Sequence, residues 1–204
     1  MPDTPAYPAL TTPRLTLQPL SMQDAEAIQR IFPQWEVVQF LADQVPWPYP
    51  ENGARDYLEH VALPAIHRGD EWHWTLRTHA DPGRMIGMVS LMDNEANNNR
   101  GFWLDPDFRG QGYMTEASDA VTAYWFDVLG KPLLRAPKAI VNTGSRKISE
   151  RGGMRVVAVE ERGFVSGRYP AEIWEITREE WEARQARQAQ QAAQGRQAPP
   201  VQRG

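Results

Sequence analysis

The sequence predicts a single α+β domain built on a mixed, mostly antiparallel sheet of about seven strands. Short apolar segments typical of strands alternate with longer segments of three- and four-residue apolar periodicity, which is typical of helices. A length of 204 residues suits one domain with a substantial core. We place this domain at residues 1–183, followed by a Gln-, Ala- and Arg-rich tail at residues 184–204.

The start of the chain is expected to contain one strand and two helical pieces. Residues 1–9 contain three prolines and no periodicity, so we expect a loose lead-in. Arg14 to Gln18 is predicted to be a strand, closed by the proline that follows it. Ser21 and Asp24 have the spacing of a capping box at the start of a helix. A second helical piece is expected around Trp35 to Leu41.

Val45 to Pro50 alternates prolines with large apolar residues. Each proline restricts the residue before it to extended backbone, so we expect a rigid connector. The ordinary role for so apolar a connector is to cover the hydrophobic core, and this is the role we expect.

The middle of the chain is expected to form a helix and then a series of strands. Glu51 to about His67 is predicted to be helical, with Val61 facing the core and Pro64 kinking or ending the helix. Residues 72–77 alternate large apolar and polar side chains, as in a half-buried strand. Met85 to Leu91 is apolar at nearly every position, which predicts a central strand. A polar turn then leads into the next, antiparallel strand.

The most informative stretch begins with that strand at Gly101 and continues through a glycine-rich loop into a long amphipathic helix. Gly110 and Gly112 come just before the helix, whose apolar stripe starts at Met114. Glycines allow the backbone to approach a ligand closely, and the first N–H groups of a helix are unpaired and lie at the positive end of its dipole. The stretch therefore predicts a cradle for a diphosphate, with Arg109 adding a charge-assisted contact.

The loop alone leaves a simpler interpretation open. A tight strand-to-helix turn needs glycines for the same conformational reason. Neither the dinucleotide-binding fingerprint nor the phosphate-binding loop that ends in Gly-Lys-Ser/Thr is matched.

The rest of the chain is expected to complete the sheet and end in a helix. Glycines should end the helix over Thr143 to Arg151, and Thr177 to Glu180 has the pattern of a capping box. From Arg184 onward no apolar stripe continues, so we expect fraying or disorder. The remaining strands are predicted over Leu133 to Val141, Met154 to Glu161 and Ala171 to Ile176.

Composition restricts the class of protein. Hydrophobic residues make up 41% and charged residues 24%, with no membrane-length apolar run and no signal peptide, so we expect a cytoplasmic protein that does not enter a membrane. A net charge of −4 disfavours a nucleic-acid partner. The absence of cysteine excludes disulfides, thiolate metal sites and an acyl-cysteine intermediate. The four histidines show no ligand spacing, so we expect no metal.

Several ordered motifs together resemble the GNAT acetyltransferases, and more narrowly the RimJ and RimL branch that acetylates protein N-termini. The strongest is Arg109-Gly110-Gln111-Gly112-Tyr113-Met114, which continues into Thr115-Glu116-Ala117 and is similar to the coenzyme A loop of that family. The resemblance extends from about Thr12 to Trp181 and includes Thr12 to Leu20, Gly87 to Leu91 and Asn142 to Lys147.

The resemblance implies a GNAT-like fold and a set of acetyl-CoA contacts. The central strands should splay apart, with the pantetheine arm lying between them against Phe102, Trp103 and Leu104. Asn142 matches the family asparagine that binds the pantetheine amide, and Ser145 matches the serine beside the thioester sulfur, although both suit the start of a helix as well. The diphosphate is expected at Arg109, Gly110, Gln111, Gly112, Tyr113 and Met114. The resemblance also places the connector at Val45 to Pro50 along the acceptor cleft, while Arg135, Arg146 and Lys147 are either solvated or near the adenosine 3′-phosphate.

The general base is not assigned by the resemblance. Members of the family often carry a carboxylate just before the central strand, and the matching position here is Asn99. Glu116 is the best-placed substitute, although a glutamate in the first turn of a helix is commonly structural. Glu95, Asp93 and His73 stay open, and so does deprotonation through water.

The implied activity is transfer of the acetyl group of acetyl-CoA to a primary amine by direct reaction in a ternary complex, with Ser145 and Glu116 as the catalytic candidates. The acceptor is a protein N-terminus or a small-molecule amine, and a homodimer is left open. Because position 99 lacks a carboxylate, the alternative is an acyl-CoA-binding sensor with little turnover.

Overall fold

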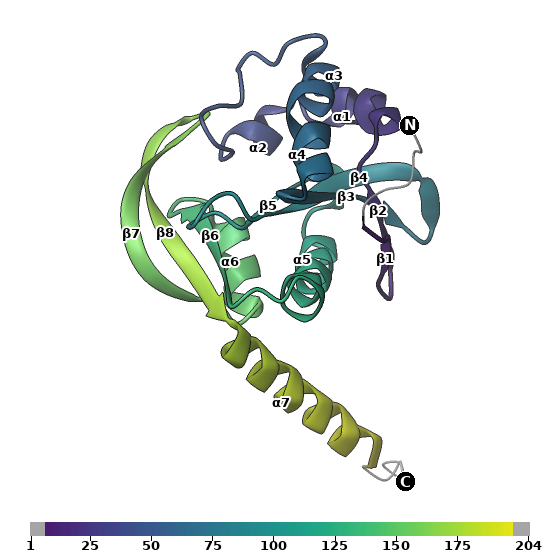
Figure 1. The fold of residues 1–204 in the computed structure, drawn as a ribbon, viewed down its shortest axis with the longest axis vertical. Coiled ribbons are helices and arrows are strands. Elements are labelled where there is room, and N and C mark those ends of the chain that lie inside the picture. The colour runs from purple at the N-terminus through teal and green to yellow at the C-terminus, as the bar shows by residue number, and fades with distance from the viewer. Residues whose placement is uncertain (1–6, 198–204) are drawn as a thin grey trace, which may run out of the picture.

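A computed structural model describes residues 7–197 of the chain. Its body contains a five-stranded sheet of order β1-β2-β3-β4-β5 and a three-stranded sheet of order β6-β8-β7, with every pairing antiparallel. Helices α1, α3 and α4 cover one side of the larger sheet, and α5 and α6 lie on the other side (Figure 1). One hydrophobic cluster joins both sheets, because Leu15, Leu76 and Val121 belong to the same buried core as Leu134 and Ile176. The predicted α+β single-domain fold is therefore confirmed.

All of the predicted strand segments are present, and a short additional strand, β1, pairs with β2. Met85 to Leu91 lies, as expected, in a central strand, because β4 is paired on both sides. The strands are β1 (Leu10–Thr11), β2 (Leu15–Pro19), β3 (Glu71–Thr78), β4 (Asp81–Met92), β5 (Arg100–Leu104), β6 (Leu133–Ala139), β7 (Arg155–Phe164) and β8 (Gly167–Thr177).

The helices that matter for the site follow β5 and β6. No helix in the part of the chain from residue 7 to residue 197 is long and apolar enough to span a membrane. The α-helices are α1 (Ala25–Ile31), α2 (Trp35–Val38), α3 (Gly53–Tyr57), α4 (Leu63–Arg68), α5 (Tyr113–Ala123), α6 (Thr143–Arg151) and α7 (Arg178–Gln197), and the shorter turns are η1 (Met22–Asp24), η2 (Leu58–Ala62), η3 (Pro106–Phe108) and η4 (Tyr124–Val128).

The helix over residues 53–68 does not end at Pro64. A π-helical turn, η2, comes directly before α4, and Pro64 occupies the first turn of α4, where a missing N–H breaks little of the hydrogen-bond pattern. The helix continues to Gly69, whose φ of 77° forms a left-handed cap. Val61 is 51% exposed, so the prediction that it faces the core was wrong; the π turn shifts the angular position of the residues within it.

Strands β5 and β6 are joined only where they begin. The backbone N–H of Asn99 donates to the carbonyl of Arg135 at 2.7 Å, and the N–H of Arg135 donates to the Asn99 side-chain oxygen at 2.8 Å. Three residues farther along each strand, the Nζ atom of Lys138 lies 4.7 Å from the ring centroid of Phe102, so the strands run in the same direction. No ladder joins them beyond residue 99 in the described sheets. Residues 100–104 and 136–139 therefore do not pair with each other, although each stretch pairs with another strand on its far edge. We call these two stretches the β5–β6 wedge.

Alternate side chains of β5 face opposite sides of the sheet. The Nη1 atom of Arg100 donates to the hydroxyl of Thr122 on α5 at 2.8 Å, which places Arg100 on the α5 side. Trp103 packs edge-on against Phe32, at the end of α1, with ring centroids 5.4 Å apart. Phe102 has the same parity as Arg100 and so shares the α5 side.

The lead-in is anchored from Tyr7 onward, contrary to the prediction of a loose segment over residues 1–9; residues 1–6 lie outside the described part. The buried Tyr7 hydroxyl donates to the carbonyl of His73, and the ring lies 4.9 Å from the Trp74 ring. Burial raises the pKa of Tyr7 to about 12. The Trp74 Nε1 atom in turn donates to the carbonyl of Pro8 at 2.9 Å.

Helix α7 starts with the predicted capping box and then projects from the body (Figure 1). The N–H of Thr177 donates to the Glu180 carboxylate at 2.9 Å, and the N–H of Glu180 donates to the Thr177 hydroxyl at 3.2 Å. The first turns are anchored by Trp181, which stacks on Phe126 with centroids 5.9 Å apart. The helix continues to Gln197, with residues 185–191 exposed.

Candidate active site

The glycine-rich loop opens directly onto the start of α5. Gly110 and Gly112 have φ angles of 77° and 81°, which only glycine adopts without strain. An added Cβ at Gly110 would meet nothing within 4 Å, so backbone conformation, not space, requires glycine there. Within residues 7–197, the backbone N–H groups of Gly112, Tyr113 and Met114 donate no hydrogen bond to the protein. These donors and the positive end of the α5 dipole are free to bind an anion.

Arg14 holds the loop from the N-terminal hairpin. Its Nη1 atom donates to the carbonyl of Gln111 at 2.9 Å, and its guanidinium lies 4.6 Å from the centroid of the Tyr113 ring. A Cβ at Gly112 would lie 3.4 Å from the Arg14 Nη2 atom. Arg14 therefore adds a positive charge beside the free N–H groups. Sequence reasoning did not single out this residue, because its partners lie about 100 positions away along the chain.

Glu116 links the same hairpin to the first turn of α5. One carboxylate oxygen accepts hydrogen bonds from the Thr12 hydroxyl at 2.6 Å and the Arg14 N–H at 2.8 Å, and the other accepts from the Arg14 Nε atom at 2.7 Å. Burial by itself raises the pKa of Glu116, but the hydrogen bonds from Thr12 and Arg14 outweigh it and hold the pKa below its usual value. A lowered pKa makes a carboxylate a weaker base, so these contacts favour an anchoring role over a general-base role.

Arg109 uses its side chain to join the loop to α2. Its Nη2 atom donates to the carbonyl of Glu36 at 2.7 Å. Partial burial lowers the pKa of this guanidinium, although Glu36 and Asp105 oppose the effect, and it stays charged at neutral pH.

The start of α6 brings Asn142 and Ser145 together. The Asn142 Oδ1 atom accepts a hydrogen bond from the backbone N–H of Ser145 at 3.2 Å and so caps the helix. Ser145 is only 8% exposed, yet its hydroxyl has no hydrogen-bond partner within residues 7–197 and is not sealed from solvent. This hydroxyl is available to a bound molecule.

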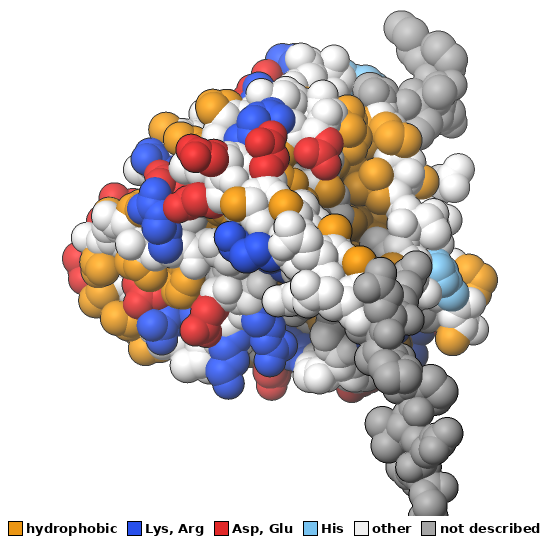
Figure 2. All heavy atoms as spheres, turned by 90° about the horizontal axis from the view of Figure 1, so that it is seen from below, with side chains coloured by type: hydrophobic (Ala, Val, Ile, Leu, Met, Phe, Trp, Pro, Cys, Tyr) orange, Lys and Arg blue, Asp and Glu red, His pale blue; other side chains and the backbone are white. Residues whose placement is uncertain are grey.

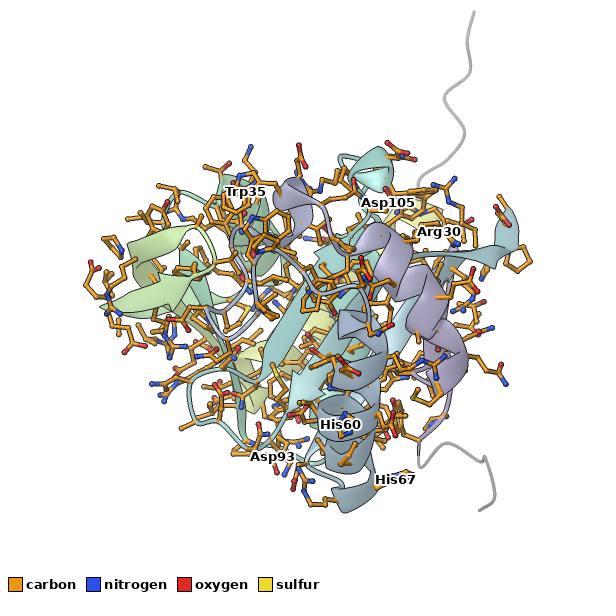
Figure 3. All side chains as sticks on the ribbon, turned by 90° about the horizontal axis from the view of Figure 1, so that it is seen from above. Arg30, Trp35, His60, His67, Asp93 and Asp105 are labelled. Atoms are coloured by element: carbon orange, nitrogen blue, oxygen red, sulfur yellow. The ribbon has the colours of Figure 1, made fainter. Side chains whose placement is uncertain are left out.

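Asn99, and the base candidates Asp93 and His73, are occupied by structural contacts, whereas Glu95 contributes only its backbone carbonyl. Asn99 closes the junction of β5 and β6, and its Nδ2 atom donates to the carbonyls of Met92 and Glu95. Asp93 forms an ion pair with Lys131. His73 is buried, with its Nε2 atom 2.6 Å from the Glu71 carboxylate. Figure 3 shows Asp93 at the opposite end of the molecule from Trp35 and Asp105.

Lys138 lies in the β5–β6 wedge beside Phe102 and was missed by the sequence analysis. It is 7% exposed, and its Nζ atom has no hydrogen-bond or ion-pair partner within residues 7–197. Burial, and secondarily the charge of Arg100, lower the pKa of Lys138 to about 7. The signal was present in the sequence, since Leu134, Ala136 and Lys138 alternate along one buried face of β6.

A series of aromatic side chains lies on the α1 side of the sheet, opposite Lys138 and Phe102. Trp103 contacts Phe32, whose ring centroid lies 5.0 Å from that of Tyr49. Trp35 and Trp47, 42% and 43% exposed, have centroids 5.5 Å apart. The prediction that residues 45–50 cover the core was wrong for Trp47, because the connector runs over the surface.

A cavity of about 270 Å³ lies beside α1 and the end of β5. Arg30 and Asp105, which line it, lie close together in Figure 3. Arg84 in its wall is paired with Asp105 at 3.2 Å. The expected cofactor-binding residues do not line this cavity.

The cations proposed for the adenosine 3′-phosphate are partly committed to carboxylates. Arg146 donates to both oxygens of Glu172, at 2.7 and 2.8 Å, and Arg135 pairs with Glu175 at 2.7 Å. Lys147 is exposed. Basic and acidic side chains are interspersed on the face shown in Figure 2.

Metal-binding clusters of three or more His, Asp or Glu side chains are absent from residues 7–197. His60 and His67 lie in the α3–α4 region, at the end of the molecule away from Trp35 (Figure 3).

Comparison with known proteins relates this geometry to one family. Residues 14–155 match the model of the acetyltransferase (GNAT) domain. YdaF of Bacillus subtilis (strain 168), a candidate ribosomal N-acetyltransferase, is 27% identical over 108 residues, which are 50% of this chain and 59% of YdaF. The chain thus spans less than two thirds of this curated relative.

Solved structures share the fold. RimL, a ribosomal L7/L12 α-N-protein acetyltransferase in complex with coenzyme A, superposes with a TM-score of 0.71 at 15% identity, covering 83% of this chain and 98% of RimL. Spermidine N-acetyltransferase from Vibrio cholerae, in complex with CoA and spermine, gives a TM-score of 0.69 at 18% identity, covering 83% and 99%. The family model matches most of the chain, including β5, the glycine-rich loop, β6 and α6. The chain belongs to the GNAT acetyltransferase family.

Proposed function

We propose that this protein is an N-acetyltransferase that transfers the acetyl group of acetyl-CoA directly to a primary amine in a ternary complex. The observation that carries the proposal is the free row of backbone N–H groups at Gly112, Tyr113 and Met114, located where β5 leaves the β5–β6 wedge. A diphosphate bound there would let the rest of an extended cofactor run along β5.

The residues present fit acetyl-CoA along this path. The loop from Arg109 to Met114 would hold the diphosphate, aided by the charge of Arg14. Backbone groups of Phe102 to Leu104 have no ladder partner on the β6 side and would pair with the pantetheine amides. Asn142 can serve the pantetheine through its side-chain N–H₂, because its oxygen alone is used in capping α6.

The chemistry that acetyl-CoA supplies is an activated thioester. The acceptor must lose a proton before its nitrogen attacks the carbonyl, and the departing sulfur needs a hydrogen-bond donor or a proton. Ser145 is the donor we assign, because its hydroxyl forms no hydrogen bond with the described part of the chain. With no cysteine in the chain, transfer proceeds without an acyl-cysteine intermediate.

The acceptor we propose is a primary amine presented on a protein N-terminus or on a small molecule. The relatives' names point to both kinds, a ribosomal-protein N-terminus for RimL and a polyamine for the Vibrio enzyme.

The test is release of free CoA thiol from acetyl-CoA with N-terminal peptides and with small amines, together with mass spectrometry of the products. Acceptor-dependent CoA release with an acetylated product supports the proposal. Tight binding of acetyl-CoA without turnover on any amine would support the acyl-CoA sensor instead. Gly112→Glu is the matched negative control, because it blocks the cradle.

A further inference from the structure

Lys138 is located where the β5–β6 wedge opens. It lies three residues beyond the Asn99–Arg135 junction, level with Phe102 on the neighbouring strand. The Nζ atom lies 4.7 Å from the centroid of the Phe102 ring, on the α5 side of the sheet. A cofactor lying along Phe102 to Leu104 would therefore pass the lysine amine.

The charged groups around Lys138 do not pair with it. Arg100 on β5 has the same sign, and its Nη1 atom is bonded to Thr122. Glu172 on β8 is opposite Lys138 in register, but its carboxylate accepts from Arg146 and from the Trp174 Nε1 atom.

Within residues 7–197, Lys138 forms no ion pair with a carboxylate of the neighbouring helices either. Asp119 on α5 pairs with Arg184 of α7 at 3.3 Å. On α6, Arg146 is committed to Glu172. An unpaired buried ammonium is costly, so this environment favours the neutral amine.

We propose that Lys138 is the general base of the transfer reaction. This inference rests on the proposed acetyltransferase function. It assigns to Lys138 the proton-accepting role that a carboxylate often has in the family. The position before β5 is Asn99, and Glu116, Asp93 and His73 are held in other contacts.

The proposed step moves one proton from the acceptor to Lys138 and replaces the thioester bond with an amide bond. The acceptor ammonium gives one proton to the neutral Lys138 amine, and its nitrogen then attacks the acetyl carbonyl carbon. A C–N bond forms, the C–S bond breaks, and its electron pair goes to sulfur. The proton that the new amide nitrogen loses passes to sulfur through the Ser145 hydroxyl, and Lys138 returns its proton to solvent.

The lysine amine suits this step because its pKa lies close to neutral pH. Burial is the main cause of the lowered pKa, about 7, and Arg100 adds to it. Below that pH Lys138 is protonated and cannot accept a proton, whereas above it the amine is neutral. Activity should therefore rise through pH 7 and level off.

Lys138→Met is the decisive variant, because methionine fills a similar volume and cannot take a proton. We expect kcat to fall by about 100- to 10,000-fold and the limb of the pH–rate profile near 7 to disappear. The CoA-induced rise in melting temperature should be retained. Lys131→Met, which removes the lysine paired with Asp93, is the control and should keep wild-type kcat and pH profile.

A second measurement does not depend on turnover. The chain has three lysines, Lys131, Lys138 and Lys147, so competitive labelling with acetic anhydride followed by mass spectrometry resolves each amine. The labelling rate of Lys138 should level off just above pH 7, with Lys131 and Lys147 labelled in the same samples as internal references.

The outcomes separate the two proposals. A wild-type protein that acetylates amines, with Lys138→Met equally active and showing the same pH limb, overturns the role of Lys138 alone. Labelling of Lys138 that still rises above pH 9 does the same. Acetylation of Lys138 itself by acetyl-CoA, combined with an active Lys138→Met enzyme, would make it a self-modification site instead. A wild-type protein that binds CoA and acetylates nothing overturns the acetyltransferase function itself.

Discussion

The side-chain oxygen of Asn142 accepts the backbone N–H of Ser145 at 3.2 Å, and this contact leaves the Ser145 hydroxyl unbonded. Helix capping and the proposed catalytic role therefore use different atoms. The cap depends on the Asn142 side chain and the Ser145 main chain, whereas the proposed donor is the Ser145 side chain. Substitutions at the two positions should separate these effects.

Ser145→Ala should lower kcat by about 10- to 1000-fold, the range for losing one acid or one oriented donor. Because the interaction develops with the charge on sulfur, kcat and kcat/KM should fall together, with acetyl-CoA affinity unchanged. Steady-state kinetics and acetyl-CoA titration measure this. Asn142→Ala is the contrast, since it removes the cap and should lower the free energy of unfolding by about 1 kcal/mol. A fully active Ser145→Ala enzyme would show that water protonates the leaving thiolate.

Gly112→Glu should abolish CoA binding, because the carboxylate repels the diphosphate and the residue must adopt a φ of 81°. In the wild type, CoA at about 100 times its Kd should add roughly 2.7 kcal/mol of apparent stability, or about 5–10 °C in Tm. Thermal-shift measurements with and without CoA provide the readout. Gly112→Ala isolates the backbone strain from the repulsion and should bind more tightly than Gly112→Glu. Equal CoA shifts for wild type and Gly112→Glu would rule out the loop as the diphosphate site.

Glu116→Ala should lower the free energy of unfolding at pH 7 by about 1–3 kcal/mol, the cost of losing hydrogen bonds to a charged group. Most of this should come from the Thr12 hydroxyl and the Arg14 N–H, because the exposed Arg14 guanidinium is screened by water. The folded-state pKa of Glu116 is lowered, so its stabilisation is present above the unfolded value of about 4.5 and is lost as the pH falls through the folded value.

Urea unfolding of wild type and Glu116→Ala at pH 7 and at pH 3 measures that stabilisation. The difference between the two proteins should shrink at the lower pH. Turnover of Glu116→Ala should stay within a few-fold of wild type at a temperature where both are folded. A loss of 100-fold or more in kcat would instead identify Glu116 as the base.

Deleting the chain from Gln185 onward should leave the melting temperature and turnover nearly unchanged, because residues 185–191 bury no side chain. Arg184 must be kept, since its Nη2 atom contacts Asp119 at 3.3 Å and the Arg151 carbonyl at 3.2 Å. Deletion from Trp181 is the control and should destabilise by about 3–5 kcal/mol, as for loss of a buried tryptophan. If the shorter deletion impairs folding or activity, α7 has a partner, for example a second copy of the chain.

Local patterns predicted much of the fold. The bounds of α6 and the capping box at Thr177 and Glu180 were correct, because caps and glycine stops act within four residues. Errors arose where distant contacts decide. Tyr7 is fixed by His73, 66 positions away, and the exposure of Trp47 depends on a surface route that no local period reveals.

In the candidate site too, local features could be predicted from the sequence, and features that depend on distant contacts could not. The positive φ angles of Gly110 and Gly112 follow from their place before a helix, whereas the Arg14 contact to Gln111 and the approach of Lys138 to Phe102 depend on how the two sheets meet. A lysine within an apolar alternation was the one local sign of the buried amine in β6.

The junction at Asn99 also fixes the point from which β5 and β6 diverge. One main-chain bond and one amide side chain hold β5 and β6 together there, so the divergence of the strands is set by a residue remote from the transferred group. We expect that a change at position 99 alters how far the strands separate at every later residue while leaving each direct contact to the thioester in place.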